Sequence, residues 1–279
     1  MLNFQKPVIL LVALLVGTVS FQATAQQANN IEWHWQDEFS KDEKDKLKTW
    51  ITLTHQAVEK RIGVYPFTVH YYFYRKVNAS EPVPWAHTKR WEGQQVHFHV
   101  DTQYELQEFL NDWTAPHEIS HLALPFLGKS YSWFAEGFAS YMQYQVMEEM
   151  GTCTSKEKEK RFEQKFSANL PKYKNNNSVV EQAKKLRKQY DFPGMYWGGA
   201  SLFYAWNRQL IREKDKNLCS LFSSYLQCCR MKNINASEIV LSLDSIADVK
   251  FGKTLLDNYE SENGVNTIKS LKQNNFLPN

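Results

Sequence analysis

The stretch APHEISHLALPFLGKSYSWFAEGFASYMQY, at residues 115–144, decides how the rest of the chain is interpreted. It begins with an H-E-x-x-H pattern at 117–121. On a helix, His117 and His121 lie one turn apart on the same face, where both imidazoles can bind one metal ion. Glu118 then lies beside the metal's open position and can take a proton from a water there. We expect a helix capped by Thr114 and ended by Pro125.

A third ligand follows in the second half of this stretch. Glu136 comes after His121 with 14 residues between them, inside W-F-A-E-G-F-A-S-Y at 133–141. The spacing of the apolar residues predicts a helix with a buried face, and Glu136 interrupts that face. A lone carboxylate there would be costly, whereas a metal-bound one is compensated. Zinc hydrolases use three protein ligands and keep one position open. We therefore predict a zinc ion held by His117, His121 and Glu136.

These two segments together resemble the gluzincin metallopeptidases, and among them the aminopeptidase-like group, whose third ligand lies in W-x-x-E-G-x-A-x-Y. The segment M-Y-W-G-G-A at 195–200 is similar to the Y-x-K-G-A element of that group, and its tyrosine follows Glu136 after 60 positions. The resemblance would give Tyr196 a part in holding the tetrahedral intermediate. The alternative is an aromatic residue that only packs at the start of a helix. The resemblance covers residues 115–205 closely.

The resemblance implies a thermolysin-like zincin catalytic domain of the α+β class, with an N-terminal mixed β-sheet packed on a C-terminal helical half. It implies one Zn²⁺ per chain and a peptide or protein substrate. Glu118 would be the general base that takes the proton of a zinc-activated water and passes it to the leaving amine. Zinc and Tyr196 would stabilise the oxyanion.

Several positions depart from the group's pattern. The loop between His121 and Glu136 is short, Gly198 stands where the group has lysine, and no G-x-M-E-N element precedes the motif. Aminopeptidase specificity is therefore not supported, and endopeptidase and exopeptidase action both stay open. The alternative is a secreted zinc-retaining binding protein, or an envelope-associated protein, that lacks peptidase activity. The intact Glu118 argues against it, because a binding protein needs no base.

The remaining chain fits a single domain at residues 26–279. Residues 42–61 are charged and helical in pattern, and residues 67–74 and 95–100 resemble strands. In the second strand, Val96, Phe98 and Val100 alternate with His97 and His99. Helical signals prevail beyond Asp112. We therefore expect a sheet-rich half at 26–111 and a helical half at 112–279.

The other histidines carry weaker signals. His97 and His99 share one face of their strand, as a metal pair could, but no matching third ligand lies near them in the sequence. We interpret them as ordinary surface or cleft histidines. His34, His55, His70 and His87 follow no pattern.

The N-terminus has the features of a signal peptide at residues 1–25. Lys6 is its only charge, residues 8–16 are apolar, and A-T-A at 23–25 suits a signal peptidase. The apolar run is shorter than the ~20 residues of a membrane span, although an uncleaved anchor is the alternative. We expect a secreted or periplasmic protein with no stable membrane insertion after signal removal.

Charge and cysteine content limit the partners. The chain has 33 Lys and Arg against 30 Asp and Glu, a balance that gives no reason to expect nucleic acid. Residues 156–190 are basic, with 11 Lys and Arg against 4 Glu, which indicates either a solvated helix pair or attraction to an anionic envelope surface or an acidic substrate. Nothing indicates an oligomeric state.

Four cysteines in an exported protein predict at least one disulfide. We expect Cys153 or Cys219 to pair with Cys228 or Cys229. A bond between the two neighbours is the least expected pairing, because adjacent residues reach disulfide geometry with difficulty.

Overall fold

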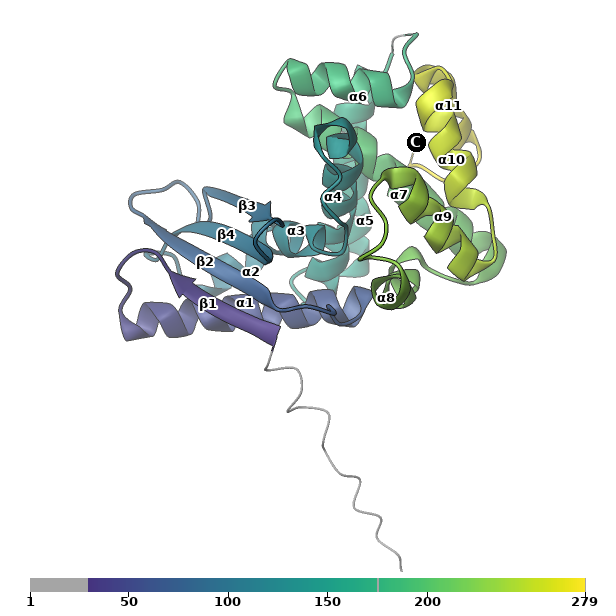
Figure 1. The fold of residues 1–279 in the computed structure, drawn as a ribbon. Helices are drawn as coiled ribbons and strands as arrows, with labels where there is room; N and C mark the ends of the chain where they lie inside the picture. Colours follow the sequence, from purple (N-terminus) through teal and green to yellow (C-terminus); the bar gives the residue numbers. More distant parts are fainter. Residues whose placement is uncertain (1–29, 175, 279) are drawn as a thin grey trace, which may run out of the picture. The chain divides into compact units, whose positions relative to one another are not determined.

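Four strands form one mixed sheet in the computed structural model, which describes residues 30–174 and 176–278 (Figure 1). Contacts divide the chain between Asn30 and Ile31, and the strands and helices named below belong to the second unit. The predicted signal peptide at 1–25 lies outside the described residues. The strands are β1 (Ile31–Trp35), β2 (Val69–Lys76), β3 (Trp85–Lys89) and β4 (Gln94–Asp101).

Helices make up most of the remaining described chain. They are α1 (Lys41–Ile62), α2 (Leu106–Asn111), α3 (Thr114–His121), α4 (Ser132–Glu149), α5 (Ser155–Asn169), α6 (Val179–Lys188), α7 (Phe192–Lys214), α8 (Leu218–Cys228), α9 (Ala236–Ala247), α10 (Phe251–Ser261) and α11 (Gly264–Gln273), with short 3₁₀ turns η2 (Lys129–Tyr131) and η3 (Leu170–Lys172). A small sheet with a mainly helical remainder agrees with the α+β class. The helix expected at 42–61 and the strands expected at 67–74 and 95–100 are confirmed within a few residues, whereas β1 and β3 were not predicted.

The strand order is β1-β2-β4-β3, so β1 and β3 are the two edges. β1, β2 and β4 run parallel, and β3 pairs antiparallel with β4. Figure 1 shows α1 lying across one face of this sheet. Trp50 of α1 is fully buried there between Phe98 and Phe109, with ring centroids 5.1 and 4.9 Å away.

The two faces of the sheet differ because side chains alternate along each strand. Toward α1 lie buried apolar residues such as Tyr71, Phe73 and Phe98. The opposite face carries histidine and tyrosine. One register row crosses all four strands there as stacked rings, His34–Tyr72–His97–His87, with neighbouring centroids 4.3, 4.4 and 4.7 Å apart.

Capping boxes mark where several helices begin. In α1 the Ser40 hydroxyl accepts the backbone N–H of Glu43, and the Glu43 carboxylate accepts the N–H of Ser40. Thr154 and Ser178 begin α5 and α6 in the same way. This local signal helps α5 to form although few of its residues are buried, whereas α6 also buries one face.

Two glycines bring the backbones of α4 and α7 into contact. A Cβ atom added at Gly137 would lie 2.4 Å from the carbonyl carbon of Gly199, and one at Gly199 would lie 2.1 Å from the oxygen of Trp133. At Gly198 a Cβ would meet the buried hydroxyl of Tyr173 at 1.8 Å. A side chain at 198, such as the lysine of the resembled pattern, has no room because the ring of Tyr173 takes that space.

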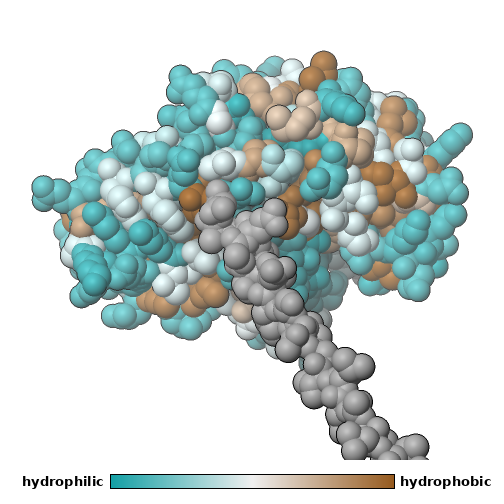
Figure 2. All heavy atoms as spheres, turned by 60° about the horizontal axis from the view of Figure 1, so that its bottom comes forward, coloured by the Kyte–Doolittle hydropathy of each residue, from teal (hydrophilic) through white to brown (hydrophobic). Residues whose placement is uncertain are grey.

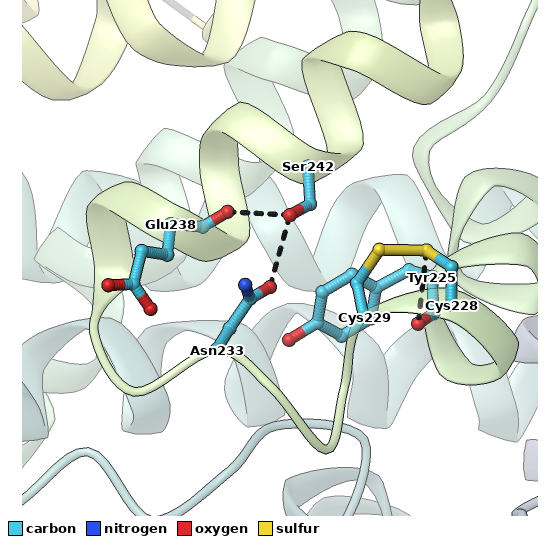
Figure 3. The surroundings of a disulfide bond; sticks show 6 residues. All are labelled: Tyr225, Cys228, Cys229, Asn233, Glu238 and Ser242. Carbon is cyan, nitrogen blue, oxygen red and sulfur yellow. Dashed lines mark hydrogen bonds between the residues drawn. A yellow bond between two sulfur atoms is a disulfide. The ribbon is translucent and has the colours of Figure 1, made fainter.

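The structure contains one disulfide, as expected, but the predicted pairing is wrong, because the bond joins Cys228 to Cys229 (Figure 3). Cys153 and Cys219 are both free and buried. Cys219 lies at the opposite end of α8 from Cys228 and packs against Met142, with 3.8 Å between the sulfur atoms. The neighbours can bond because α8 ends at Cys228 and Cys229 leaves helical geometry, at φ −133° and ψ −26°.

The surface is mainly polar. Figure 2 shows one face, on which hydrophilic residues dominate and apolar ones form separate patches. Within the part of the chain that the structure describes, no helix combines the length and the apolar character needed to cross a bilayer.

We predict that Gly137→Ala destabilises the protein, because the new methyl group would overlap backbone atoms of α7 that cannot move aside alone. Overpacking of this kind costs about 1–3 kcal/mol or more. Urea unfolding of the variant measures the change. Gly151→Asn is the control, since its φ is 73° and an added Cβ meets no atom within 4 Å, and asparagine tolerates this region. A Gly137→Ala variant as stable as wild type would contradict the close contact.

Candidate metal centre

Helices α3 and α4 bring the three predicted ligands together. The Nε2 atoms of His117 and His121 lie 3.2 and 3.4 Å from one oxygen of Glu136. All three ligand atoms are within 4.8 Å of one another. Both histidines are buried and Glu136 is partly exposed. The structure thus places a carboxylate of α4 directly over the histidine pair of α3.

The donor set fits a zinc ion. Two imidazole nitrogens and one carboxylate oxygen are typical zinc ligands, and ligands about 2.0–2.1 Å from a tetrahedral ion lie about 3.3 Å apart. The observed separations of 3.2 and 3.4 Å agree with that spacing. His117 is also oriented for the role, because its Nδ1 lies 3.1 Å from the side-chain oxygen of the buried Gln143. Donation of the Nδ1 proton to Gln143 leaves Nε2 free to bind a metal.

Three side chains from distant segments hold the last carbonyl groups of α3. The Tyr65 hydroxyl donates to the carbonyl of Ile119 at 2.7 Å, Arg90 donates to that of His121 at 2.6 Å, and Arg230 to that of Leu122 at 3.1 Å. Helix ends leave such carbonyls without internal partners, and cations are favourable there. α3 therefore ends at His121, four residues before the predicted stop at Pro125. Its first turn also differs from expectation, since the N-cap is Trp113 and not Thr114.

The charges around the centre are strongly perturbed. Burial opposes ionisation of Glu136, but the charges and hydrogen bonds of His121 and His117 outweigh it and hold the pKa of Glu136 low. Burial raises the pKa of Glu118, and the two histidines compensate only in part. Burial and the charge of Arg230 lower the pKa of Arg90 to about 10, which leaves its guanidinium protonated at neutral pH.

A cavity of about 430 Å³ opens beside the ligands. Glu118, His121, Glu136 and Tyr196 all line it. The Tyr196 ring centroid is 5.9 Å from that of His117. Burial, together with the negative charges of Glu136 and Glu118, raises the pKa of Tyr196, so its hydroxyl stays protonated. Other walls come from the edge strand β3 and the residue after it, from η2 and from the basic stretch, as Ala86, His87, Thr88, Arg90, Lys129 and Arg187.

Four of the five predicted site residues therefore line one cavity, and the fifth, His117, contacts Glu136 beside it. Other contributors were missed. Gln143 had a readable signal, because it follows Glu136 by seven positions and so shares its helix face. No sequence signal pointed to Arg90 or Arg230, since their contacts with α3 depend on how distant segments fold. Outside this centre, Glu32, His34 and His70 converge on the sheet.

No protein-family model matches the chain, and a comparison with curated proteins finds no relative.

We predict that Gln143→Leu weakens zinc binding about 10- to 100-fold, the usual cost of losing a partner that orients a histidine ligand. Competition titration against a chromogenic chelator measures this directly. Gln145→Leu is the matched control, because Gln145 is also buried on α4 but accepts from Lys158 at 3.3 Å. Equal zinc affinity in the two variants would mean that Gln143 does not orient His117.

Proposed function

We propose that the protein is a secreted zinc-dependent peptidase of gluzincin type, with a thermolysin-like catalytic domain. The observation that carries the proposal is the convergence of His117, His121 and Glu136 beside a cavity that Glu118 also lines. A metal-binding role alone would need the three ligands and no adjacent carboxylate. The signal-peptide features of residues 1–25 support export to the periplasm or the exterior.

When bound at this centre, zinc would supply Lewis-acid activation of a water molecule and polarise a carbonyl group. Glu118 accepts the proton of that water and returns it to the leaving amine. Its raised pKa suits both steps, because a general base works best when its pKa lies near the working pH. Tyr196 keeps its hydroxyl proton and donates a hydrogen bond to the developing oxyanion. Gln143 holds the His117 ring in position.

The position of β3 supports a peptide as the substrate. β3 is an edge strand of the described sheet, so one row of its backbone groups has no neighbouring strand. Ala86, His87 and Thr88 of β3 line the cavity. An extended peptide can add to such an edge through main-chain hydrogen bonds. A peptide bound there would pass along the wall of the cavity that contains Glu118.

Cleavage of a peptide library, mapped by mass spectrometry, tests the proposal. We expect cleavage products that disappear with a chelator and return when zinc is added. The positions of the cuts would also separate endopeptidase from exopeptidase action. Zinc-loaded protein that cleaves no peptide would favour the binding or envelope-associated alternative.

We predict that Glu118→Gln retains zinc and loses turnover by about 10²- to 10⁴-fold, because the amide cannot accept the proton. Metal analysis and the peptide assay on the same sample measure both properties. Glu260→Gln, at an exposed position of α10, is the control and should keep full activity. Wild-type turnover in zinc-loaded Glu118→Gln would exclude Glu118 as the base.

We predict that Tyr196→Phe lowers kcat about 100-fold or more, because one oxyanion donor is lost. KM should hardly change, since the hydrogen bond forms mainly in the transition state. Zinc content and thermal stability should stay at wild-type values. Tyr190→Phe, at a side chain that is 82% exposed, is the control. If Tyr196→Phe keeps most of the wild-type kcat, Tyr196 only packs against its neighbours.

A further inference from the structure

We propose a second zinc site on the sheet, formed by Glu32 and His34 of β1 and His70 of β2. The Nδ1 atom of His70 lies 3.1 Å from a Glu32 carboxylate oxygen and 3.2 Å from the Nε2 of His34. The third separation, between Glu32 and His34, is 3.8 Å. These values are close to the spacing of about 3.3 Å that ligands of a tetrahedral zinc ion adopt.

Strand geometry brings these ligands together. Glu32 and His34 are two positions apart on β1, so both side chains point to the same face of the sheet. The parallel register places His70 of β2 directly opposite Glu32. The His34 ring stacks on Tyr72, with centroids 4.3 Å apart and planes 11° apart, which restricts the plane of the imidazole. The three ligand atoms therefore converge without any change of backbone.

His97, on the same face of the sheet, is less suited to bind a metal. His97 uses both ring nitrogens, since Nδ1 lies 3.1 Å from the Tyr74 hydroxyl and Nε2 lies 2.9 Å from the Gln95 side-chain oxygen. In contrast, the Nδ1 of His70 and the Nε2 of His34 face each other and the same carboxylate. A cation that accepts three lone pairs satisfies all three groups at once.

The site differs from the α3–α4 centre in exposure. The side chains of Glu32, His34 and His70 are 57%, 31% and 25% exposed, so solvent reaches the remaining coordination position. β1 is a five-residue edge strand at the start of the described unit. A zinc ion here would tie β1 to β2, and we infer that its role is to hold this edge strand in place.

Counting zinc per chain tests the proposal, and the count does not depend on peptidase activity. At saturating zinc we expect two ions in wild type, one in His70→Ala, one in His121→Ala and none in the double variant. His99→Ala is the matched control, because His99 lies on the same sheet face outside the three ligands, and it should keep two ions. Glu32→Gln keeps the size of the side chain but removes its charge, and it should weaken binding of the second ion on the order of 100-fold.

If a variant folds poorly, the change in melting temperature on zinc addition tests the second site instead of the zinc count. In His121→Ala, zinc at ~100-fold above its dissociation constant should raise the melting temperature by about 5 °C or more. The same addition should have no effect on His121→Ala/His70→Ala. A single ion in saturated wild type that His70→Ala retains would overturn the proposal. So would a second ion that persists in His70→Ala and Glu32→Gln, or one that is lost in His99→Ala.

Discussion

The backbone contact between α4 and α7 at Gly137 and Gly199 sets the geometry on which the candidate metal centre depends. Packed helices usually keep their axes 8–10 Å apart because side chains separate them. Here neither helix has a side chain at the crossing, and an added Cβ would overlap backbone atoms of the other helix. Glu136 immediately precedes one glycine, and Tyr196 lies one turn before the other. The contact therefore fixes the carboxylate and the phenol together, on the side that faces α3.

Local patterns predicted the parts of this arrangement that lie within one element. The i, i+4 spacing of His117 and His121 and the alternation at 95–100 each reflect the geometry of a single helix or strand. Contacts between elements are harder to predict from the sequence. Arg90 and Arg230 reach α3 from segments far away in the chain, and the register of β1 on β2 puts His70 opposite Glu32. A sequence read one window at a time carries no information about such partners.

The sequence did not predict the two short edge strands or the cysteine pairing, and the reasons are related. β1 and β3 have five residues each, too few for the alternation that marks residues 95–100 to be recognised. For the cysteines, α8 places Cys219 and Cys228 at its opposite ends, so these two cannot bond. The pairing itself depended on where α8 ends, and the chain leaves helical geometry at Cys229, which lets the neighbours bond.

A chain of buried polar side chains joins the sheet to α3, the helix that carries His117 and His121, and connects the two histidine clusters through β2. The Tyr71 hydroxyl of β2 lies 2.6 Å from Nδ1 of His55, whose Nε2 lies 3.2 Å from Glu59. Glu59 accepts the backbone N–H of Tyr65, and the Tyr65 hydroxyl donates to the carbonyl of Ile119 in α3. Buried polar groups are costly unless each finds its partner, so only one placement of α3 on the sheet satisfies this chain. Because β2 carries Tyr71 on its inner face and His70 on its outer face, the same strand positions α3 on one side and the exposed cluster on the other.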